Sequence, residues 1–107
     1  MKRYKIIENN DHIGYLNVEY EVGVDRYITA DLFKKSESFM LLHDKNGHVN
    51  EKMMKLWIEE RIVPRTRIGI EDNLKQMGLT EYDELAILKF TKGRKVTDKC
   101  YIDFNEL

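Results

Sequence analysis

The sequence is poor in the residues that cross-link a chain or interrupt it. Its 107 residues include one cysteine, Cys100, one proline, Pro64, and one tryptophan, Trp57. A lone cysteine cannot form a disulfide within the chain. No run approaches the roughly 20 apolar residues of a membrane-spanning helix, and charged side chains interrupt residues 1–20, where a signal peptide needs an apolar segment. We therefore expect a cytoplasmic protein without a membrane anchor.

Neither sign of charge dominates the chain. It has 18 Lys and Arg against 19 Asp and Glu, a formal net charge of -1. This balance removes the simplest argument for a nucleic-acid-binding protein, which is a strongly basic sequence. With 42% hydrophobic and 35% charged residues, the chain should fold and carry a surface dense with charge. We expect residues 1–107 to form a single domain, with strands in 1–42 and helices in 49–104.

The first third of the chain has the alternation of a β-meander. Apolar and polar side chains alternate through residues 13–22, and shorter runs of the same kind lie at 4–8 and 26–33. Polar or glycine-containing segments at 9–12 and 23–25 are suited to the turns between them. A three-stranded sheet with one apolar face needs a covering layer, which the helices can supply. The side chains expected on the apolar face of the long strand are Leu16, Val18, Tyr20 and Val22.

From residue 49 onward the apolar spacing becomes helical. Asn50 is suited to cap the start of a first helix, whose apolar stripe includes Met53, Met54, Trp57 and Ile58. This helix should end before Pro64, because proline disfavours helical geometry in the residue ahead of it.

Two further helices are predicted after the proline. Thr66 is the expected cap of a second helix that ends at Gly78, and Thr80 begins a capping-box variant that opens a third helix through about Phe90. Gly93 should end that helix, and residues 96–104 fit either a short helix or a strand that rejoins the sheet. The predicted fold class is α+β, with an N-terminal antiparallel β-meander packed against three or four short C-terminal helices.

No catalytic or metal-binding motif is complete. The segment 43–48 has two histidines and an Asp-x-Asn-Gly core, but in a calcium loop Leu42 and Met53 would occupy the two strongest ligand positions. We therefore expect a β-turn there. Cys100 has no activating neighbours and is expected to be a buried thiol. Glycine-rich phosphate loops and nucleophile elbows are absent from the sequence, so we predict no enzyme, no cofactor and no metal site.

The basic residues form two groups in the sequence. Arg61, Arg65 and Arg67 bracket Pro64, and a second group surrounds Gly93. If the groups meet in space, they form a cationic patch able to bind phosphate or an acidic protein surface; otherwise they are solvated side chains. The aromatic residues do not alternate with the basic ones as they would in a base-stacking platform. The second group contains Lys89, Lys92, Arg94, Lys95 and Lys99.

The order of features after residue 47 is similar to the N-terminal accessory domain of HipA-like kinases of the kind found in Firmicutes. The motifs are GHVN at the start of a helix, LWIEERIVPRTRIGIEDNLKQMGL at 56–79 and LAILKFTKGRKVTDKCYIDF at 85–104. Cys100 departs from the pattern, which often has a polar residue or tyrosine there. The residues that match the family pattern are Trp57, Arg61, Pro64, Arg67, Gly78, Leu79, Leu88, Thr91, Gly93, Asp98, Tyr101 and Ile102.

The resemblance implies a stand-alone version of that accessory domain, because the ATP-binding loop and catalytic aspartates of the kinase have no counterpart in the sequence. We expect an interaction module that binds and regulates or neutralises a HipA-like kinase or a related toxin–antitoxin partner. Two alternatives remain open: a small phage or mobile-element inhibitor of a bacterial defence nuclease, and a weak nucleic-acid-binding protein. The oligomeric state is undetermined. The expected contact surface is the turn at Pro64, with Trp57 and Ile62 as anchors, unless Trp57 is core, and Arg61, Arg65 and Arg67 as charge partners.

Overall fold

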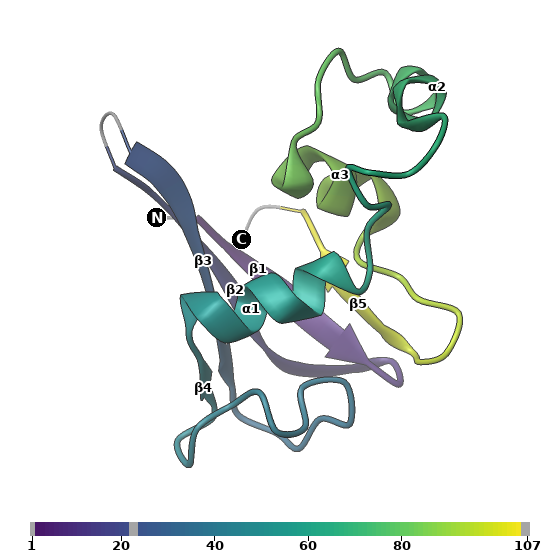
Figure 1. Ribbon diagram of the computed structural model, residues 1–107. Coiled ribbons are helices and arrows are strands. Elements are labelled where there is room, and N and C mark those ends of the chain that lie inside the picture. The colour runs from purple at the N-terminus through teal and green to yellow at the C-terminus, as the bar shows by residue number, and fades with distance from the viewer. Residues whose placement is uncertain (1, 22–23, 106–107) are drawn as a thin grey trace.

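The computed structural model of the chain describes residues 2–21 and 24–105 and shows one five-stranded antiparallel sheet with three short helices (Figure 1). The strand order is β4-β3-β2-β1-β5. The α+β prediction is therefore confirmed. The elements are β1 (Lys2–Glu8), β2 (Asp11–Glu21), β3 (Val24–Leu32), β4 (His48–Val49), α1 (Glu51–Glu59), α2 (Ile70–Gln76), α3 (Glu84–Thr91) and β5 (Cys100–Asp103).

The predicted meander is formed by β1, β2 and β3. Asn9 and Asn10 make the first turn in left-handed conformations, with φ of 53° and 64°. Asparagine tolerates this region better than most residues, which is why the sequence allows so tight a turn. The second predicted turn includes Gly23, which lies outside the described residues, as do Val22 and the side chain of Tyr20.

The C-terminal tail is a strand, which settles the alternative that the sequence left open. β5 pairs antiparallel with β1, and Ile6 lies opposite Ile102. Both side chains are fully buried, so the tail adds a strand to the edge of the sheet and an apolar side chain to the core. A short β4, which the sequence did not predict, pairs with β3 on the opposite edge.

One face of the sheet carries the core. In Figure 1, α1 crosses this face, α3 lies near β5, and α2 stands furthest from the strands. Leu16 and Val18 are fully buried, as the alternation predicted. Trp57 of α1 is fully buried as well and stacks on Phe39, with ring centres 4.8 Å apart and planes 11° apart.

The start of α1 and the end of α2 follow the predicted signals. The side chain of Asn50 accepts a hydrogen bond from the backbone N–H of Met53, which satisfies a free donor in the first turn. At the end of α2, Gly78 has φ of 76°, and the N–H of Leu79 bonds to the carbonyl of Leu74. This is a Schellman motif, in which glycine adopts the left-handed conformation without steric cost.

The predicted starts of the second and third helices are wrong. Thr66 does not cap α2; the chain first makes a turn closed by the N–H of Arg67 and the carbonyl of Pro64, and Gly69 occupies the cap position. For α3 the cap is Asp83 rather than Thr80, because the Asp83 carboxylate accepts hydrogen bonds from the N–H groups of Leu85 and Ala86. The aspartate side chain satisfies N–H groups in the first turn of the helix, so the helix begins directly after Asp83.

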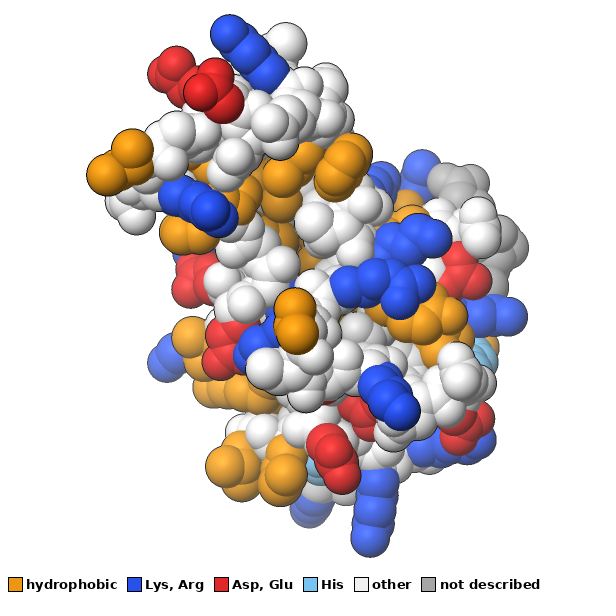
Figure 2. Space-filling model, turned by 90° about the vertical axis from the view of Figure 1, so that its right-hand side faces the viewer, with side chains coloured by type: hydrophobic (Ala, Val, Ile, Leu, Met, Phe, Trp, Pro, Cys, Tyr) orange, Lys and Arg blue, Asp and Glu red, His pale blue; other side chains and the backbone are white. Residues whose placement is uncertain are grey.

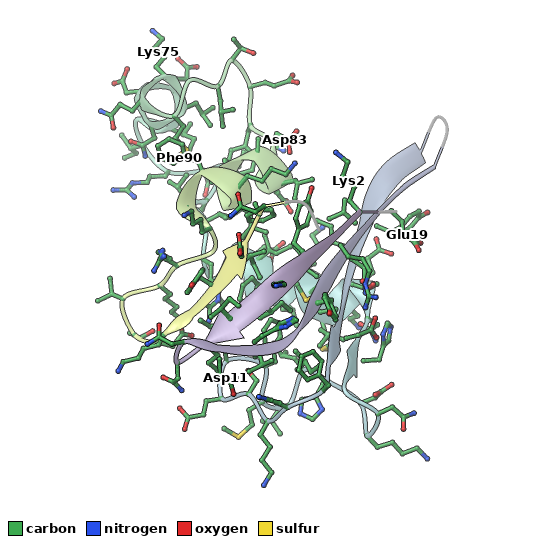
Figure 3. All side chains as sticks on the ribbon, turned by 180° about the vertical axis from the view of Figure 1, so that it is seen from behind. Lys2, Asp11, Glu19, Lys75, Asp83 and Phe90 are labelled. Carbon is green, nitrogen blue, oxygen red and sulfur yellow. The ribbon has the colours of Figure 1, made fainter. Side chains whose placement is uncertain are left out.

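The other face of the sheet is not covered by any described helix. Seen from behind in Figure 3, β1 and β2 face the viewer and α1 lies beyond them. Asn17 is buried on this face and links neighbouring strands, accepting from Arg3 Nε at 3.0 Å and donating to Asp31 at 2.8 Å. The rings of His12, Tyr15 and Phe33 contact one another beside it. We call this side of the sheet the open face.

Candidate functional site

The loop between α1 and α2 projects from the molecule as an exposed corner. We call residues 64–69 the Pro64 corner; all of them are exposed. The side chain of Ile68 is 99% exposed, and the exposed residues Arg65 and Arg67 precede it by three and one positions. Two successive turns shape the corner, with N–H to carbonyl bonds of 3.1 Å from Arg67 to Pro64 and from Ile70 to Arg67. The corner therefore presents two cations and an apolar side chain on a hydrogen-bonded backbone.

Tyr82 fastens the corner to the rest of the fold. Its hydroxyl donates to the carbonyl of Val63 at 2.7 Å, immediately before the proline. The guanidinium of Arg65 lies over the Tyr82 ring, 4.6 Å from its centre. Partial burial raises the pKa of Tyr82 above its ordinary value, and the nearby carboxylate of Glu84 acts in the same direction, against the smaller effect of Arg65. The phenol therefore stays protonated and remains a hydrogen-bond donor at neutral pH.

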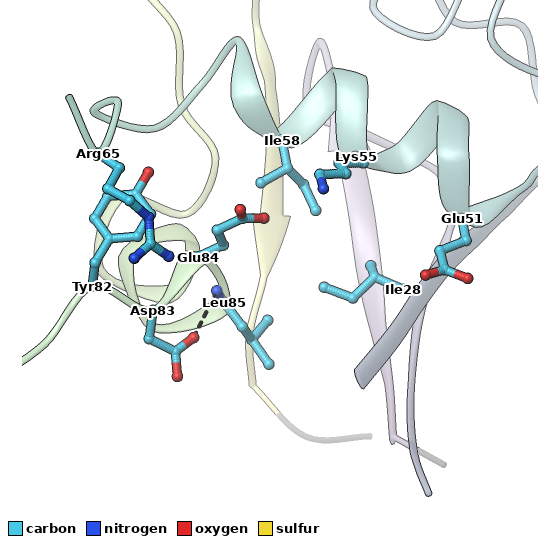
Figure 4. A pocket seen from close by; sticks show the side chains of 9 residues that line it. All are labelled: Ile28, Glu51, Lys55, Ile58, Arg65, Tyr82, Asp83, Glu84 and Leu85. Carbon is cyan, nitrogen blue, oxygen red and sulfur yellow. Dashed lines mark hydrogen bonds between the residues drawn. The ribbon is translucent and has the colours of Figure 1, made fainter. Parts of the chain in front are cut away.

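A hollow of about 390 Å³ adjoins the corner between α1, β3 and the start of α3 (Figure 4). Its apolar lining comes from Ile28, Ile58 and Leu85. Figure 4 shows Arg65 and Tyr82 side by side at one end and Glu51 at the other. Charges of both signs surround the apolar residues, so the hollow suits a mixed protein surface better than a small ion. The charged lining residues are Glu51, Lys55, Arg65, Asp83 and Glu84.

Three residues predicted as direct contacts are buried, and that part of the prediction is wrong. Trp57 is fully buried and belongs to the core, the alternative already open for it, while Ile62 is 8% exposed. The side chain of Arg61 is only 1% exposed, because it turns inward over the ring of Trp57, 4.2 Å from its centre. Pro64, Arg65 and Arg67 are the predicted contact residues that reach the surface.

Arg61 is bound within the protein by Asp98. Its guanidinium pairs with both carboxylate oxygens of Asp98 and also donates to the carbonyl of Gly93 at 3.0 Å. Burial alone would raise the pKa of Asp98, but the hydrogen bonds from Arg61 and from the N–H of Cys100, together with the positive charge of Arg61, outweigh it and hold that pKa below its ordinary value. This charge pair is internal and offers no group to a partner.

The predicted basic patch near Gly93 lies on the loop that connects α3 to β5. Lys92, Arg94 and Lys99 are exposed, whereas Lys95 faces Glu60 at 3.8 Å. Figure 2, a view from the side of this loop, shows most Lys and Arg side chains over its right half. Arg94 lies over the ring of Tyr101, 4.2 Å from the centre. Arg61 reaches this loop as the buried partner of Asp98 and the Gly93 carbonyl, and Arg65 instead contacts Tyr82. A second hollow, of about 290 Å³, is lined by this loop and by the Asn9–Asn10 turn.

The histidine-containing turn and the cysteine take no part in a described metal or nucleophile site. The segment 43–48 forms the expected β-turn, with the N–H of Gly47 bonded to the carbonyl of Asp44 at 3.1 Å. Cys100 is 1% exposed, and burial raises the pKa of its thiol to about 12. A protonated, inaccessible thiol is a poor nucleophile. Within residues 2–21 and 24–105, no group of three or more His, Cys, Asp or Glu side chains is placed to hold a metal ion.

A buried carboxylate that the sequence did not single out organises the long loop after β3. Glu8 is 7% exposed and accepts hydrogen bonds from the Ser36 hydroxyl at 2.9 Å and from the N–H of Ser38 at 3.1 Å. Ser38 in turn donates to Asp98 at 3.0 Å. These bonds hold Phe39 in place against Trp57. The sequence held one signal for this: Glu8 falls on the apolar face of its strand, two residues after Ile6, where a buried charge needs hydrogen-bond partners.

Comparisons with protein-family models, with curated proteins and with solved structures return no match. None of the described helices has the length and apolar character needed to cross a membrane. The function must therefore be argued from the surfaces described above.

Proposed function

We propose that the protein is a non-catalytic interaction module that binds and restrains a partner protein through the Pro64 corner. The partner proposed first is a HipA-like kinase or a related toxin–antitoxin component, on the strength of the sequence resemblance. The proposal rests on the 99% exposure of Ile68, which directly follows a segment with two exposed arginines, Arg65 and Arg67. Arginine and apolar anchors are typical of the few residues that dominate binding energy at interfaces.

The rigid backbone of the Pro64 corner and the hollow beside it favour binding to a partner protein. Its backbone is closed by two turns and tied to Tyr82, so little conformational entropy is lost when a partner contacts it. The neighbouring hollow offers apolar side chains and charges of both signs. An isoleucine in solvent contributes nothing to the stability of this chain, whereas its burial by a partner stabilises a complex by roughly 1.5–3 kcal/mol. We place this function in the cytoplasm, where a lone thiol such as Cys100 stays reduced.

The test compares two exposed apolar residues on different loops. Ile68→Asp removes the proposed anchor, and Val96→Asp is the matched control, because Val96 is 104% exposed on the loop before β5. Binding to a HipA-like kinase encoded by a neighbouring gene is measured by isothermal titration calorimetry. We expect Ile68→Asp to weaken binding at least about tenfold, the scale of a lost anchor. Val96→Asp should match the wild type.

Kinase inhibition gives a second measurement. The wild type and Val96→Asp should reduce phosphorylation by that kinase, and Ile68→Asp should not. If the wild-type protein neither binds nor inhibits the kinase, the partner is wrong. If it binds and Ile68→Asp binds equally well, the Pro64 corner is not the contact surface.

A further inference from the structure

Two arginine–tyrosine pairs stand on the open face of the sheet. The guanidinium carbon of Arg3 lies 4.2 Å from the ring centre of Tyr15, and that of Arg94 lies at the same distance from Tyr101. Tyr15 belongs to β2 and Tyr101 to β5, with β1 between these strands. Both tyrosines are partly exposed. Strand pairing thus brings together aromatic and basic residues that are far apart in the sequence, an arrangement that the order of residues along the chain does not reveal.

Lys5 lies between the two pairs. It is on β1, opposite Tyr15 on one side and Asp103 on the other. Lys99 is exposed at the rim and lines the hollow of about 290 Å³, together with Arg94 and Tyr101. Neither lysine has an ion-pair partner among the described residues. The open face therefore carries two lysines that form no ion pair in the described part of the chain, although Asp103 stands opposite Lys5.

Most carboxylates near these cations are already engaged. Asp98 pairs with the buried Arg61, and Asp31 is bonded to His48 and Asn17. The exceptions are Asp103, whose carboxylate accepts hydrogen bonds from the backbone and side-chain nitrogens of Asn105, and the exposed Glu19 of β2. Neither has a cationic partner among the described residues, but together they are fewer than the four cations Arg3, Lys5, Arg94 and Lys99. A local excess of positive charge thus exists on a molecule whose overall net charge is -1.

We propose that the open face binds single-stranded nucleic acid. Unpaired bases stack on aromatic side chains and on guanidinium planes, and each Arg–Tyr pair supplies both. The lysines between and beside the pairs are placed to contact the phosphates, and the rim hollow is large enough to admit one. A duplex keeps its bases stacked on each other and cannot use the rings in this way. This activity uses a different surface from the Pro64 corner and does not depend on the proposed kinase partner.

Fluorescence anisotropy with a fluorescein-labelled oligothymidylate of about 15 nucleotides tests the proposal, since one sheet-sized site covers about 4–16 nucleotides. For about three neutralised phosphates, the logarithm of the binding constant should fall with the logarithm of salt concentration with a slope of about -2. An unlabelled duplex of the same length should compete poorly. No measurable binding, a flat salt response or equal competition by duplex would each overturn the proposal.

The site is located by substitutions that are expected to change oligonucleotide affinity in opposite directions. Lys5→Glu and Lys99→Glu should each weaken oligonucleotide binding about tenfold, because each substitution removes a phosphate contact and adds a negative charge that repels phosphate. Asp103→Asn should strengthen it several-fold, and because asparagine can keep the bonds to Asn105 the fold is not at risk. The controls, Lys52→Glu on α1 and Lys75→Glu on α2, change residues that are exposed, as Lys99 is, and that lie away from the open face. Equal losses in controls and site variants would mean that general charge, not this face, causes binding.

Stacking is tested separately with Tyr101→Leu, which keeps an apolar side chain and removes the ring. We expect a loss of about five- to twentyfold for one stacked base. If affinity is unchanged and heparin competes as well as the oligonucleotide, the face is only a polyanion-binding surface and the proposal fails. Ile68→Asp should leave oligonucleotide binding intact, so this result is independent of the outcome for the kinase.

Discussion

Arg61 is the residue whose role is most sharply defined by its surroundings. It is a buried cation with three kinds of contact: the carboxylate of Asp98, the carbonyl of Gly93 and the ring of Trp57. A buried charge is stable only when its partners satisfy it, and Asp98 is the residue that supplies the opposite charge. The pair thereby joins the end of α1 to the loop before β5.

Removing one partner of this pair should destabilise the fold severely. For Arg61→Ala we expect a loss of about 3–5 kcal/mol in the free energy of unfolding, because Asp98 is left partly buried without its cation and a cavity opens beside Trp57. The control is Lys34→Ala, which breaks the exposed pair with Asp11, whose side chains are 49% and 56% exposed, and should cost less than about 1 kcal/mol. Urea denaturation followed by circular dichroism measures both. Similar losses in the two variants would show that the Arg61–Asp98 pair is not structural.

The burial of Arg61 could not be predicted from its neighbours in sequence. The charged residues around it suggested a solvated turn, and its partner Asp98 lies on a distant loop. Arg65 and Arg67, by contrast, were expected to face outward and are exposed. The direction of a long side chain depends on tertiary partners, and a single sequence does not reveal them.

At the scale of elements, glycine and asparagine gave the most dependable signals. Asn50 caps α1, and Gly78 ends α2, because each placement depends only on local backbone chemistry. The predictions for Thr66 and Thr80 failed because of other local signals. Thr66 lies in the turn that begins at Pro64, and Asp83, rather than Thr80, caps α3. The tail was ambiguous because pairing with β1 decides it, and that pairing is long-range.

Two glycines in left-handed conformations should differ in what an added methyl group costs. Gly93 has φ of 69°, and a Cβ there would lie 3.1 Å from Trp57 and 3.2 Å from Leu88, two fully buried side chains that would have to shift to make room. Gly78 has φ of 76° and nothing within 4 Å. We expect Gly93→Ala to cost about 2–4 kcal/mol and Gly78→Ala about 1 kcal/mol, the second being backbone strain alone.

Thermal unfolding of the two alanine variants measures this difference, with the lower melting temperature expected for Gly93→Ala. Both substitutions carry the same backbone penalty, so each controls for the other. Equal melting temperatures would show that Trp57 and Leu88 can shift, and that the contact at Gly93 does not restrict the packing of α1 against α3.

At the scale of the whole molecule, the two halves of the sequence build one core. The sheet contributes Leu16 and Ile102, the loop after β3 contributes Phe39, and α1 contributes Trp57; all four are fully buried. The first and last strands pair with each other, so segments from both halves of the sequence belong to the same sheet. The surfaces proposed for binding lie outside this core: the Pro64 corner is at the end of the molecule with α2, and the open face is behind the sheet (Figures 1 and 3).

This shared core predicts a single cooperative unfolding transition. Trp57 is the sole tryptophan, so its fluorescence reports the packing of α1 against the loop after β3, while far-ultraviolet circular dichroism reports the strands and helices together. In urea the two signals should give the same midpoint, since neither half buries its apolar face without the other. Phe39→Leu, which removes the ring stacked on Trp57, should lower both midpoints together by the same amount. Separate midpoints, or a shift in fluorescence alone, would show that the sheet and the helical part unfold independently and that the chain is not one folding unit.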